Sequence, residues 1–379
     1  MTSNACQAYI IAARRTVIGR IGGLHRNRRV EDLAVAALQA ALADARLSPR
    51  DVQQLVLGNA TEGGNPARVI GLCAGLPETA PALTLDRQCA SGLEAILTAI
   101  RLVQSGDADI VAAGGAESLS TAPWRVARPR SAAQQPRFLE PGHTDFEAEE
   151  TLAVRGQIAR KRQDAYALAS RRTAAASGSL ARDIAVLRPG AAEARDEWVA
   201  HAPSAEELAE LPPLHDAGGT LTSGTISPSG DAAAMVIVVG QNCYQRLGRP
   251  AALCLVGSAA TGAPPSAEAD APIRAVQKLR QRLNGSAVRP VAACELNETC
   301  AAQAIVFSDT LGIAPQTLNR SGGALAHGRP FGASSAVLVV GLFGQLIGSR
   351  AASGPQLGLA ATGALGGLGL AALFETQAF

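Results

Sequence analysis

The sequence predicts an α/β protein that is built from two similar halves with mostly buried sheets. Segments with the apolar character of buried strands alternate with segments of helical periodicity along both halves of the chain. The order helix, strand and Asn-containing turn occurs at residues 31–59 and again at residues 273–298. A chain of 379 residues, of which 47% are hydrophobic, is large enough for two or three domains or for one large duplicated domain.

The N-terminal half begins with a strand, a helix and a second strand. The apolar segment 8–13 is typical of a strand, and the segment 52–57 predicts another strand that ends in Gly58-Asn59. Between them, residues 31–46 predict a helix. Its core-facing residues are expected to be Leu33, Ala37, Leu38, Ala41 and Leu42.

One cysteine lies between a short strand and a helix of this half. The strand is the apolar segment 82–85, and after Cys89 small residues lead into apolar positions at helical spacing. Unpaired amides and the positive end of the helix dipole favour a thiolate and lower a thiol pKa from its usual value of about 8.5. We therefore predict an exposed, activated Cys89 thiolate. A small buried hydrophobe is the ordinary alternative for a cysteine.

Residues 119–228 differ in composition from the rest of the chain and predict an inserted loop lobe. This segment contains four prolines before residue 142, both tryptophans and twelve arginines. Residues 164–176 have helical character, whereas 125–143 are expected to be irregular. The apolar run within 231–240 then predicts a return to a core strand.

The C-terminal half repeats the helix and strand pattern and ends in a long uncharged stretch. Residues 273–283 predict a helix, and residues 291–296 a strand that ends in Asn297-Glu298. Residues 355–374 carry no charge over 20 positions, which is the length of a membrane span. Their five glycines would break a lone helix repeatedly, so we expect a buried strand, a glycine turn, a second buried strand and no membrane contact.

Composition and charge exclude several functional classes. The net charge is +2, the pI is near 8.2 and only 3% of residues are aromatic, so a nucleic-acid partner is not expected. The seven cysteines are scattered without a C-x-x-C pair, which predicts neither a disulfide framework nor a metal site. The polar segment 1–7 lacks the pattern of a secretory signal. We therefore expect a cytoplasmic protein.

Four blocks, in the same order along the chain, resemble the thiolase family from end to end. These blocks are the turn at Cys89, Gly114–Ser118, Asn297-Glu298 and Gly322–Ser334. The resemblance implies a five-layered α/β/α/β/α core of two similar halves and a homodimer or homotetramer. The halves would comprise residues 1–118 with 229–246 and residues 247–379, and the loop lobe 119–228 would bind coenzyme A.

The resemblance also implies a two-step acyl transfer. A cysteine takes the acyl group from a thioester, and coenzyme A or the α-carbon of a second acyl thioester receives it. Cys89 matches this nucleophile. Asn297 matches the residue that orients a water in one oxyanion site, and the Cys89 amide would serve the other. An acyl-coenzyme A or acyl-carrier thioester is then the substrate, and no permanently bound cofactor is expected.

Two positions depart from the family pattern. Arg329, in Gly328-Arg329-Pro330, stands where the family has the histidine that accepts the nucleophile's proton. Gly363 stands where the family has a second cysteine, which exchanges the α-carbon proton. A guanidinium does not release its proton in proteins, so Arg329 is no base. A cation about 4 Å from a thiolate, at an effective dielectric near 20, contributes roughly 4 kcal/mol, or close to three pKa units. Arg329 could therefore hold Cys89 as a thiolate.

Three side chains are candidates to replace the two lost groups. His327 lies two positions before Arg329, and alternate residues of an extended segment share a face, so it could act as a substitute base. Its alternative is a histidine packed behind the loop. Cys294 and Cys300 are candidates for the missing thiol, with burial in the core as their alternative.

Residues of the loop lobe are expected along the coenzyme A substrate. Arg195 and Ser227 match segments that lie along coenzyme A in thiolases, and phosphates favour guanidinium partners. Phe146 belongs to a segment that replaces the border of the pantetheine arm. The other arginines of the lobe are expected to be solvated surface residues.

Two functional hypotheses follow from these residues. The first is an acyltransferase that loads an acyl group onto Cys89 and passes it to coenzyme A, to a malonyl-type donor that loses carbon dioxide, or to an amine, alcohol or water. Decarboxylation creates the carbanion without a base, so the missing thiol at Gly363 would not matter. The second is a catalytically impaired paralogue that binds acyl thioesters or scaffolds an active partner. Cys89 and Asn297 favour the first hypothesis, and the two lost acid/base groups favour the second.

Overall fold

The computed structural model describes most of the chain. The described residues are 7–127, 137–139, 146–177, 183–185, 187, 195–201, 203–215, 218–283, 290–347 and 354–377. The strands are β1 (Ala8–Arg15), β2 (Gly19–Arg20), β3 (Gln54–Gly58), β4 (Ala82–Leu85), β5 (Ile110–Glu117), β6 (Arg125–Ala127), β7 (Arg137–Leu139), β8 (Gly230–Gly240), β9 (Ala252–Gly262), β10 (Ala293–Asn297), β11 (Leu357–Ala364) and β12 (Leu368–Gln377). The α-helices are α1 (Val30–Ala45), α2 (Pro66–Cys73), α3 (Ser91–Ser105), α4 (Glu147–Arg155), α5 (Arg160–Ala176), α6 (Ala205–Glu210), α7 (Gln241–Arg246), α8 (Ala271–Arg282), α9 (Ala301–Leu311), α10 (Ala324–His327) and α11 (Phe331–Ile347).

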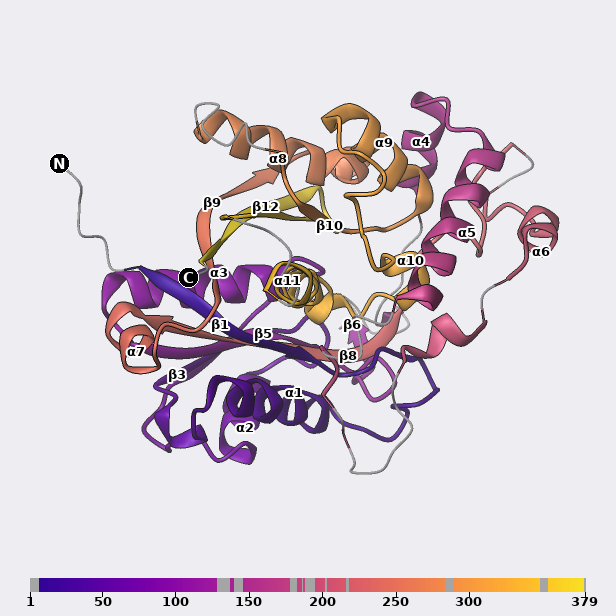
Figure 1. Cartoon of the computed structure of the whole chain (residues 1–379). Helices are drawn as coiled ribbons and strands as arrows, with labels where there is room; N and C mark the ends of the chain where they lie inside the picture. The colour runs from indigo at the N-terminus through magenta and orange to yellow at the C-terminus, as the bar shows by residue number, and fades with distance from the viewer. Residues whose placement is uncertain are drawn as a thin grey trace.

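These elements stack in five layers (Figure 1). Helices α1 and α2 cover the outer face of the strands β1, β3, β5 and β8, and α3 and α11 cover their inner face (Figure 1). Strands β9, β10 and β12 lie on the other side of α11, and α8 and α9 form the opposite outer layer (Figure 1). The α/β/α/β/α core expected from the sequence is therefore confirmed.

The strands of both halves belong to one mixed sheet. Its order is β10-β11-β12-β9-β1-β8-β5-β3-β4, with β2 paired to β8. The halves join where β1 and β9 pair antiparallel at Tyr9↔Cys254 and Ile10↔Leu253. Strand β3 pairs in parallel with β4 and β5, and β10 pairs in parallel with β11. Strands β4 and β10 are thus the two edges of the sheet.

Most elements lie where the hydrophobic pattern predicts them. The expected core-facing residues of α1 are at most 2% exposed; they are Leu33, Ala37, Leu38, Ala41 and Leu42. The uncharged stretch 355–374 forms the antiparallel strands β11 and β12, joined by a turn in which Gly366 and Gly367 have φ of 84° and 80°. Within the part of the chain that the structure describes, no helix is long and apolar enough to cross a membrane.

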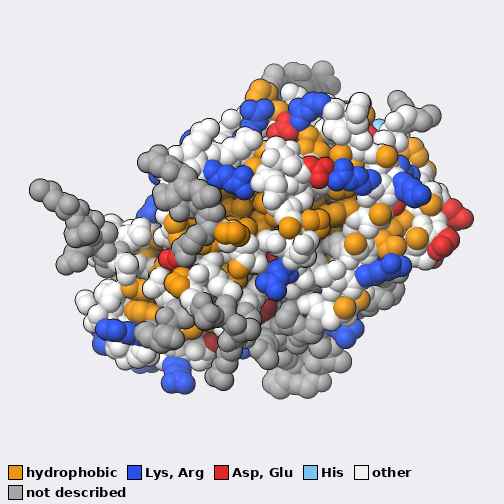
Figure 2. Space-filling view, turned by 45° about the horizontal axis from the view of Figure 1, so that its top comes forward, with side chains coloured by type: hydrophobic (Ala, Val, Ile, Leu, Met, Phe, Trp, Pro, Cys, Tyr) orange, Lys and Arg blue, Asp and Glu red, His pale blue; other side chains and the backbone are white. Residues whose placement is uncertain are grey.

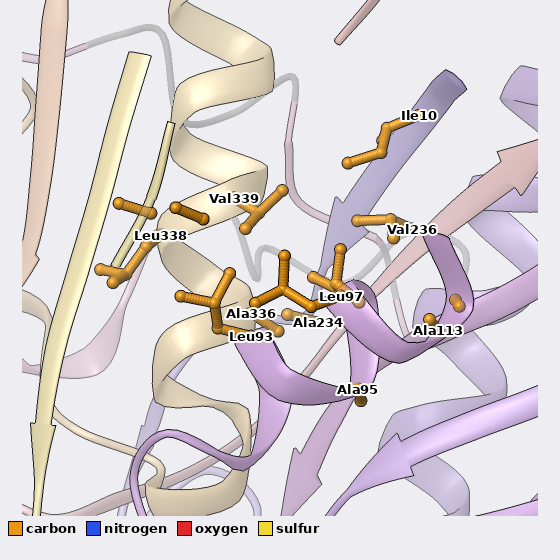
Figure 3. Close-up of a cluster of buried hydrophobic side chains, with 14 of the residues drawn as sticks. Ile10, Leu93, Ala95, Leu97, Ala113, Ala234, Val236, Ala336, Leu338 and Val339 are labelled. Atoms are coloured by element: carbon orange, nitrogen blue, oxygen red, sulfur yellow. The ribbon is translucent and has the colours of Figure 1, made fainter. Parts of the chain in front are cut away.

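The middle layer holds the start of α3 in place. Leu93 and Leu97 of α3 lie in one apolar cluster with Ala336 and Val339 of α11 (Figure 3). The two helices approach so closely at Gly92 that a Cβ there would lie 2.8 Å from the Cβ of Ala336. The amide of Leu93 donates to the hydroxyl of Ser335 on α11 at 2.9 Å. The start of α3, beside Cys89, is therefore fixed by α11.

The loop lobe lies beside the C-terminal half. Helices α4 and α5 both contact α9, and α5 also contacts α10 (Figure 1). The segment 125–143 was expected to be irregular, but β6 and β7 within it pair antiparallel, so that expectation is wrong for these strands. The other residues of this segment lie outside the described ranges.

The described surface carries no concentrated positive charge on the face in Figure 2. Lys and Arg side chains are scattered there among acidic and apolar ones and do not form one basic patch.

Candidate active site

One pocket brings together three of the residues singled out in the sequence. The space between its lining residues, including the part open to solvent, is about 280 Å³. The lining residues are Cys89, Glu149, Glu268, Thr299, Gln303, Arg329, Gly363, Ala364 and Leu365. They come from both halves of the chain and, through Glu149, from the loop lobe. Cys89, Arg329 and Gly363 therefore meet in one pocket, as the family resemblance implies.

A tight turn between β4 and α3 positions Cys89. Gln88 has a left-handed backbone, with φ of 52°. The hydroxyl of Ser91 accepts from the amide of Arg87 at 2.7 Å and donates to the carbonyl of Gln88 at 2.6 Å. Cys89 directly precedes Ala90, the residue that caps α3. The predicted position at a helix start is thus confirmed.

The environment of the Cys89 thiol differs from the prediction. Cys89 is 4% exposed, so the expected exposed thiolate is wrong. Burial raises the pKa of the thiol above its ordinary value, although Arg329 acts to lower it, and Glu117 adds to the increase. Removing the thiolate from water thus outweighs the nearby positive charge and the helix end. Cys89 rests as a thiol near neutral pH.

Arg329 is held firmly in the same pocket. Its amide donates to the carbonyl of Pro228 at 2.7 Å, and its carbonyl accepts from the amide of Gly230 at 3.2 Å. The side chain is buried, donates to the hydroxyl of Thr299 at 3.4 Å and lies 5.4 Å from the ring centroid of Phe331. A cation at this distance from an aromatic ring is attracted to its face. The guanidinium charge is therefore fixed beside the nucleophile.

His327 does not lie in this pocket. Residues 324–327 form the short helix α10 and are not extended, so His327 and Arg329 do not share a face. Nδ1 of His327 lies 2.7 Å from Oδ2 of Asp196, and Nε2 lies 2.9 Å from the carbonyl oxygen of Ser321. Both ring nitrogens are engaged, which contradicts the interpretation of His327 as a substitute base. It is the packed histidine of the alternative.

Asp196 links three distant parts of the chain behind the pocket. Its carboxylate accepts from both terminal nitrogens of Arg15, at 2.8 and 2.9 Å, and from the amide of Ile18 at 2.7 Å. It also pairs with His327 of α10. Burial alone would raise the pKa of Asp196, but Arg15 and His327 together lower it below its ordinary value. The segment that leads into Arg329 is thereby tied to β1.

Asn297 lines a second cavity. Its side-chain amide donates to the hydroxyl of Thr362 at 3.2 Å, and the residue is 2% exposed. His327 and Gly323 line the same space, which measures about 350 Å³ with the part open to solvent. Asn297 is not among the residues that line the Cys89 pocket. Its role in an oxyanion site stays a prediction.

Glu298, the next residue, fastens the lobe to the motif that carries Arg329. Its buried carboxyl accepts from the hydroxyl of Tyr166 at 2.6 Å, from the side chain of Asn319 at 2.6 Å and from the amide of Leu325 at 3.1 Å. Burial raises the pKa of Glu298 above its usual value. These contacts join α5, the turn at Asn319 and α10.

Neither of the two other candidate thiols reaches the pocket. Cys294 and Cys300 are fully buried, and burial raises the pKa of both. The sulfur of Cys300 accepts from the amide of Gln303 at 3.3 Å at the start of α9. Both cysteines therefore have the core positions of the alternative interpretation.

The residues expected along coenzyme A lie outside the Cys89 pocket. Arg195 is exposed. Ser227 is buried and donates to the carbonyl of Glu298 at 2.6 Å. Phe146, which precedes α4, packs against an apolar cluster that contains Ala153 and Cys300. Their contacts with a substrate stay predictions.

Sequence reasoning missed the roles of two acidic residues, Glu117 and Glu149. Glu117 ends β5 and is fully buried. Its carboxyl accepts from the amides of Ala60 at 3.0 Å and Gly332 at 2.9 Å, and burial raises its pKa to about 7. Glu117 thus fastens the loop after β3 to the start of α11. The signal in the sequence was the pair Gly114-Gly115 before Glu117. Gly115 lets the start of α11 come close to β5, because a Cβ there would lie 2.1 Å from the carbonyl oxygen of Gly332.

Glu149 lines the Cys89 pocket from α4 and is 2% exposed. The only signal in the sequence was the pair Glu149 and Ala153, which are one helical turn apart and share a face. Within the described ranges, no three His, Cys, Asp or Glu side chains gather as a metal site would require.

Comparison with known proteins covers nearly the whole chain. Family models described as the thiolase N-terminal and C-terminal domains match residues 8–242 and 250–376. An acetyl-CoA acetyltransferase from Chromobacterium violaceum is 34% identical over 97% of this chain and 98% of its own length. A beta-ketoadipyl-CoA thiolase from Pseudomonas knackmussii is 34% identical over 93% of this chain and 95% of its own. The crystal structure of human mitochondrial 3-ketoacyl-CoA thiolase in complex with CoA is 27% identical, with a TM-score of 0.89 over 99% of both chains.

Proposed function

Because the chain belongs to the thiolase family and is an acyltransferase, we propose that it works through an acyl thioester on Cys89. The observation that carries this proposal is the pocket in which the buried thiol of Cys89 and the guanidinium of Arg329 meet. A thiol is the group that forms such a thioester, and a fixed cation beside it stabilises the thiolate that forms and leaves in each half of the reaction.

The acyl donor in this proposal is a coenzyme A thioester, which acts as a substrate, and no permanently bound cofactor takes part. The names of the two curated relatives include a coenzyme A thioester, and the similar human enzyme was crystallised with CoA. These two relatives are named for different acyl groups, so the family alone does not select one. We expect Arg195, Ser227 and Phe146 to lie along coenzyme A, within a lobe that spans residues 119–228.

The loading step needs no base at Arg329. The sulfur of Cys89 attacks the thioester carbonyl, the carbon–sulfur bond to coenzyme A breaks, and the thiol proton passes to the departing thiolate. Arg329 favours the anionic sulfur throughout, and burial strengthens this effect because little water screens the charges. The high pKa of the resting thiol makes the attack slower than at a histidine-activated cysteine. Transfer back to a second coenzyme A is the same step in reverse.

The scaffolding alternative has less support. The similarity to named acyltransferases extends over almost the full length of each relative, and Cys89 lines a pocket together with Arg329, which supports the role of nucleophile proposed for it. The lost histidine slows acyl loading without preventing it, and the lost cysteine affects only the second half of a condensation.

Acyl exchange between two thiols tests the proposed function. We would mix the protein with acetyl-coenzyme A and dephospho-coenzyme A and measure acetyl-dephospho-coenzyme A by chromatography. The expected result is a product that Cys89→Ala abolishes and that Cys243→Ala retains, since Cys243 is a buried core cysteine away from the pocket. A rate that is equal in all three proteins and in buffer would contradict the proposal.

We also propose that two copies of the chain pair through β4. This strand is an edge of the sheet, and its four uncharged residues are only half-buried. The unpaired backbone groups of an edge strand are a template for a second strand.

We also propose a cytoplasmic location. The supporting observation is that six cysteines are free thiols, as expected in a reducing compartment; they are Cys73, Cys89, Cys243, Cys254, Cys294 and Cys300.

A further inference from the structure

The Cys89 pocket contains a buried carboxyl group that takes no part in the loading step. Glu149 lines this pocket together with Cys89 and Arg329 and is 2% exposed. Ala153, one turn further along α4, is 1% exposed and packs in the cluster of Cys300. Residues four apart lie on the same side of a helix, so the face of α4 that carries Glu149 is the one turned toward α9 and the pocket.

The helix that carries Glu149 is fixed by its neighbour in sequence. The carboxylate of Glu150 accepts from the amide of Thr220 at 2.7 Å, from the hydroxyl of Thr220 at 2.8 Å and from the amide of Leu221 at 3.0 Å. Glu150 thus acts as a clamp between α4 and the end of the loop lobe. A side chain on a helix anchored in this way keeps a defined position, as proton transfer to a substrate requires.

The charges of the pocket suit a proton acceptor at Glu149. Arg329 supplies a buried positive charge in the same pocket, so a carboxylate at Glu149 has an opposite charge nearby. Arg329 cannot accept a proton itself. The second carboxylate of the pocket, Glu268, is only half-buried and accepts from the amide of Gly366 at 2.9 Å, so it holds the turn between β11 and β12.

Gly363 brings no acid or base to the pocket, and its neighbours pack closely around it. A Cβ at Gly363 would lie 3.3 Å from Cδ of Pro272, 3.6 Å from the carbonyl oxygen of Glu268 and 3.7 Å from Nε2 of Gln303. Among the described residues of β11, only Gly363 and Ala364 line the pocket, and neither has a side chain that can carry a proton. We propose that Glu149, on the opposite element α4, removes and returns the α-carbon proton of the acyl thioester that accepts the acyl group. This inference rests on the proposed acyl transfer at Cys89.

The proposed step balances without any further reactant. The carboxylate of Glu149 takes a proton from the α-carbon of a second acyl-coenzyme A, and the electron pair of that C–H bond becomes the enolate. The enolate carbon bonds to the acyl carbonyl on Cys89, and the carbon–sulfur bond to Cys89 breaks. The Cys89 thiolate leaves beside Arg329 and then takes the proton from Glu149. The products are a β-ketoacyl-coenzyme A and the resting enzyme.

Hydrogen exchange at the α-carbon tests this role separately from acyl loading. The full-length protein would be incubated with acetyl-coenzyme A in D₂O, and deuterium in the acetyl methyl group would be measured by mass spectrometry. In the same samples the intact protein mass would report the acetyl adduct on Cys89. Glu149→Gln keeps the size and hydrogen-bonding shape of the side chain, and Glu147→Gln makes the same change at an exposed position of the same helix.

We expect the parent protein to exchange the methyl protons. In Glu149→Gln the exchange rate should fall by at least about 100-fold, which is the lower end of the effect of a general base. The acetyl adduct should persist in Glu149→Gln, and Glu147→Gln should exchange within about twofold of the parent. An adduct without any exchange in the parent, or exchange that falls by less than about tenfold in Glu149→Gln, would overturn the role of Glu149 alone. Absence of the adduct from the parent would overturn the proposed function and this inference together.

Discussion

Replacing Asp196 with asparagine tests how the pocket is held together. The substitution keeps the size of the side chain and removes the negative charge that pairs with Arg15 and His327. In the pair of Arg15 and Asp196 the side chains are 3% and 1% exposed, and the two ions are 2.8 Å apart. The variant therefore leaves the Arg15 guanidinium buried without its carboxylate.

The expected loss of stability follows from this burial. Removing one partner of a buried ion pair costs about 3–5 kcal/mol because the other charge stays out of water. At roughly 2 °C per kcal/mol for a chain above about 200 residues, Asp196→Asn should lower Tm by about 6–10 °C at pH 7. Asp44→Asn is the matched control, since the pair of Arg14 and Asp44 is 24% and 43% exposed and exposed pairs contribute at most about 1 kcal/mol.

The pH dependence gives a second check on the same variant. Because the folded protein holds the pKa of Asp196 below its ordinary value of 3.8, its stabilising charge is present above that pH and is lost as the pH falls further. Thermal unfolding followed by circular dichroism should show the full difference in Tm between parent and variant from pH 5 to pH 8. A Tm for Asp196→Asn within about 2 °C of the parent at pH 7, like the Asp44→Asn control, would refute this reasoning.

Three further predictions concern Glu117, Arg329 and β4. Burial raises the pKa of Glu117 from 4.5 to about 7, so the stabilisation by its protonated carboxyl is full below pH 4.5 and is lost as the pH rises to 7. Between pH 4.5 and pH 7, the free energy of unfolding in urea should therefore fall by about 3 kcal/mol more in the parent than in Glu117→Gln. The same pH slope in both proteins would contradict the raised pKa. Burial raises the pKa of Cys89 and Arg329 acts to lower it, so Arg329→Met should slow alkylation of Cys89 by iodoacetamide at pH 8. Equal rates would argue against a nearby cation. The mass of the parent protein in light scattering should be at least twice the 38.6 kDa of one chain. Thr84→Pro, which removes an N–H of β4, should reduce this mass to that of a monomer, whereas Thr84→Val should leave it unchanged.

Local patterns in the sequence predicted the framework of the molecule and part of its site. Strands β11 and β12 followed from the glycines that a single helix could not hold, and the turn at Cys89 followed from a short strand before a helical repeat. Arg329 and Gly363 entered the pocket as the motifs indicated. The strands and the turn depend on neighbours in the sequence, whereas the resemblance to a known family implied that Arg329 and Gly363 meet Cys89.

The features that escaped prediction depend on contacts between distant segments. The pKa of Cys89 is set by burial, which involves residues more than 200 positions away such as Thr299 and Arg329. His327 turns away from the pocket because α10 is helical and Asp196 holds its ring. Glu149 carries no recognisable motif, and only the packing of α4 beside α9 places it near Cys89.

The central claim is that Cys89 carries the acyl group. The most direct measurement is the intact mass of the protein after incubation with acetyl-coenzyme A, followed by peptide mapping of the modified residue. The account predicts one acetyl group, located on Cys89, that is absent from Cys89→Ala and is released when free coenzyme A is added. No acetyl group on the parent protein, or an equal amount on Cys89→Ala, would contradict it.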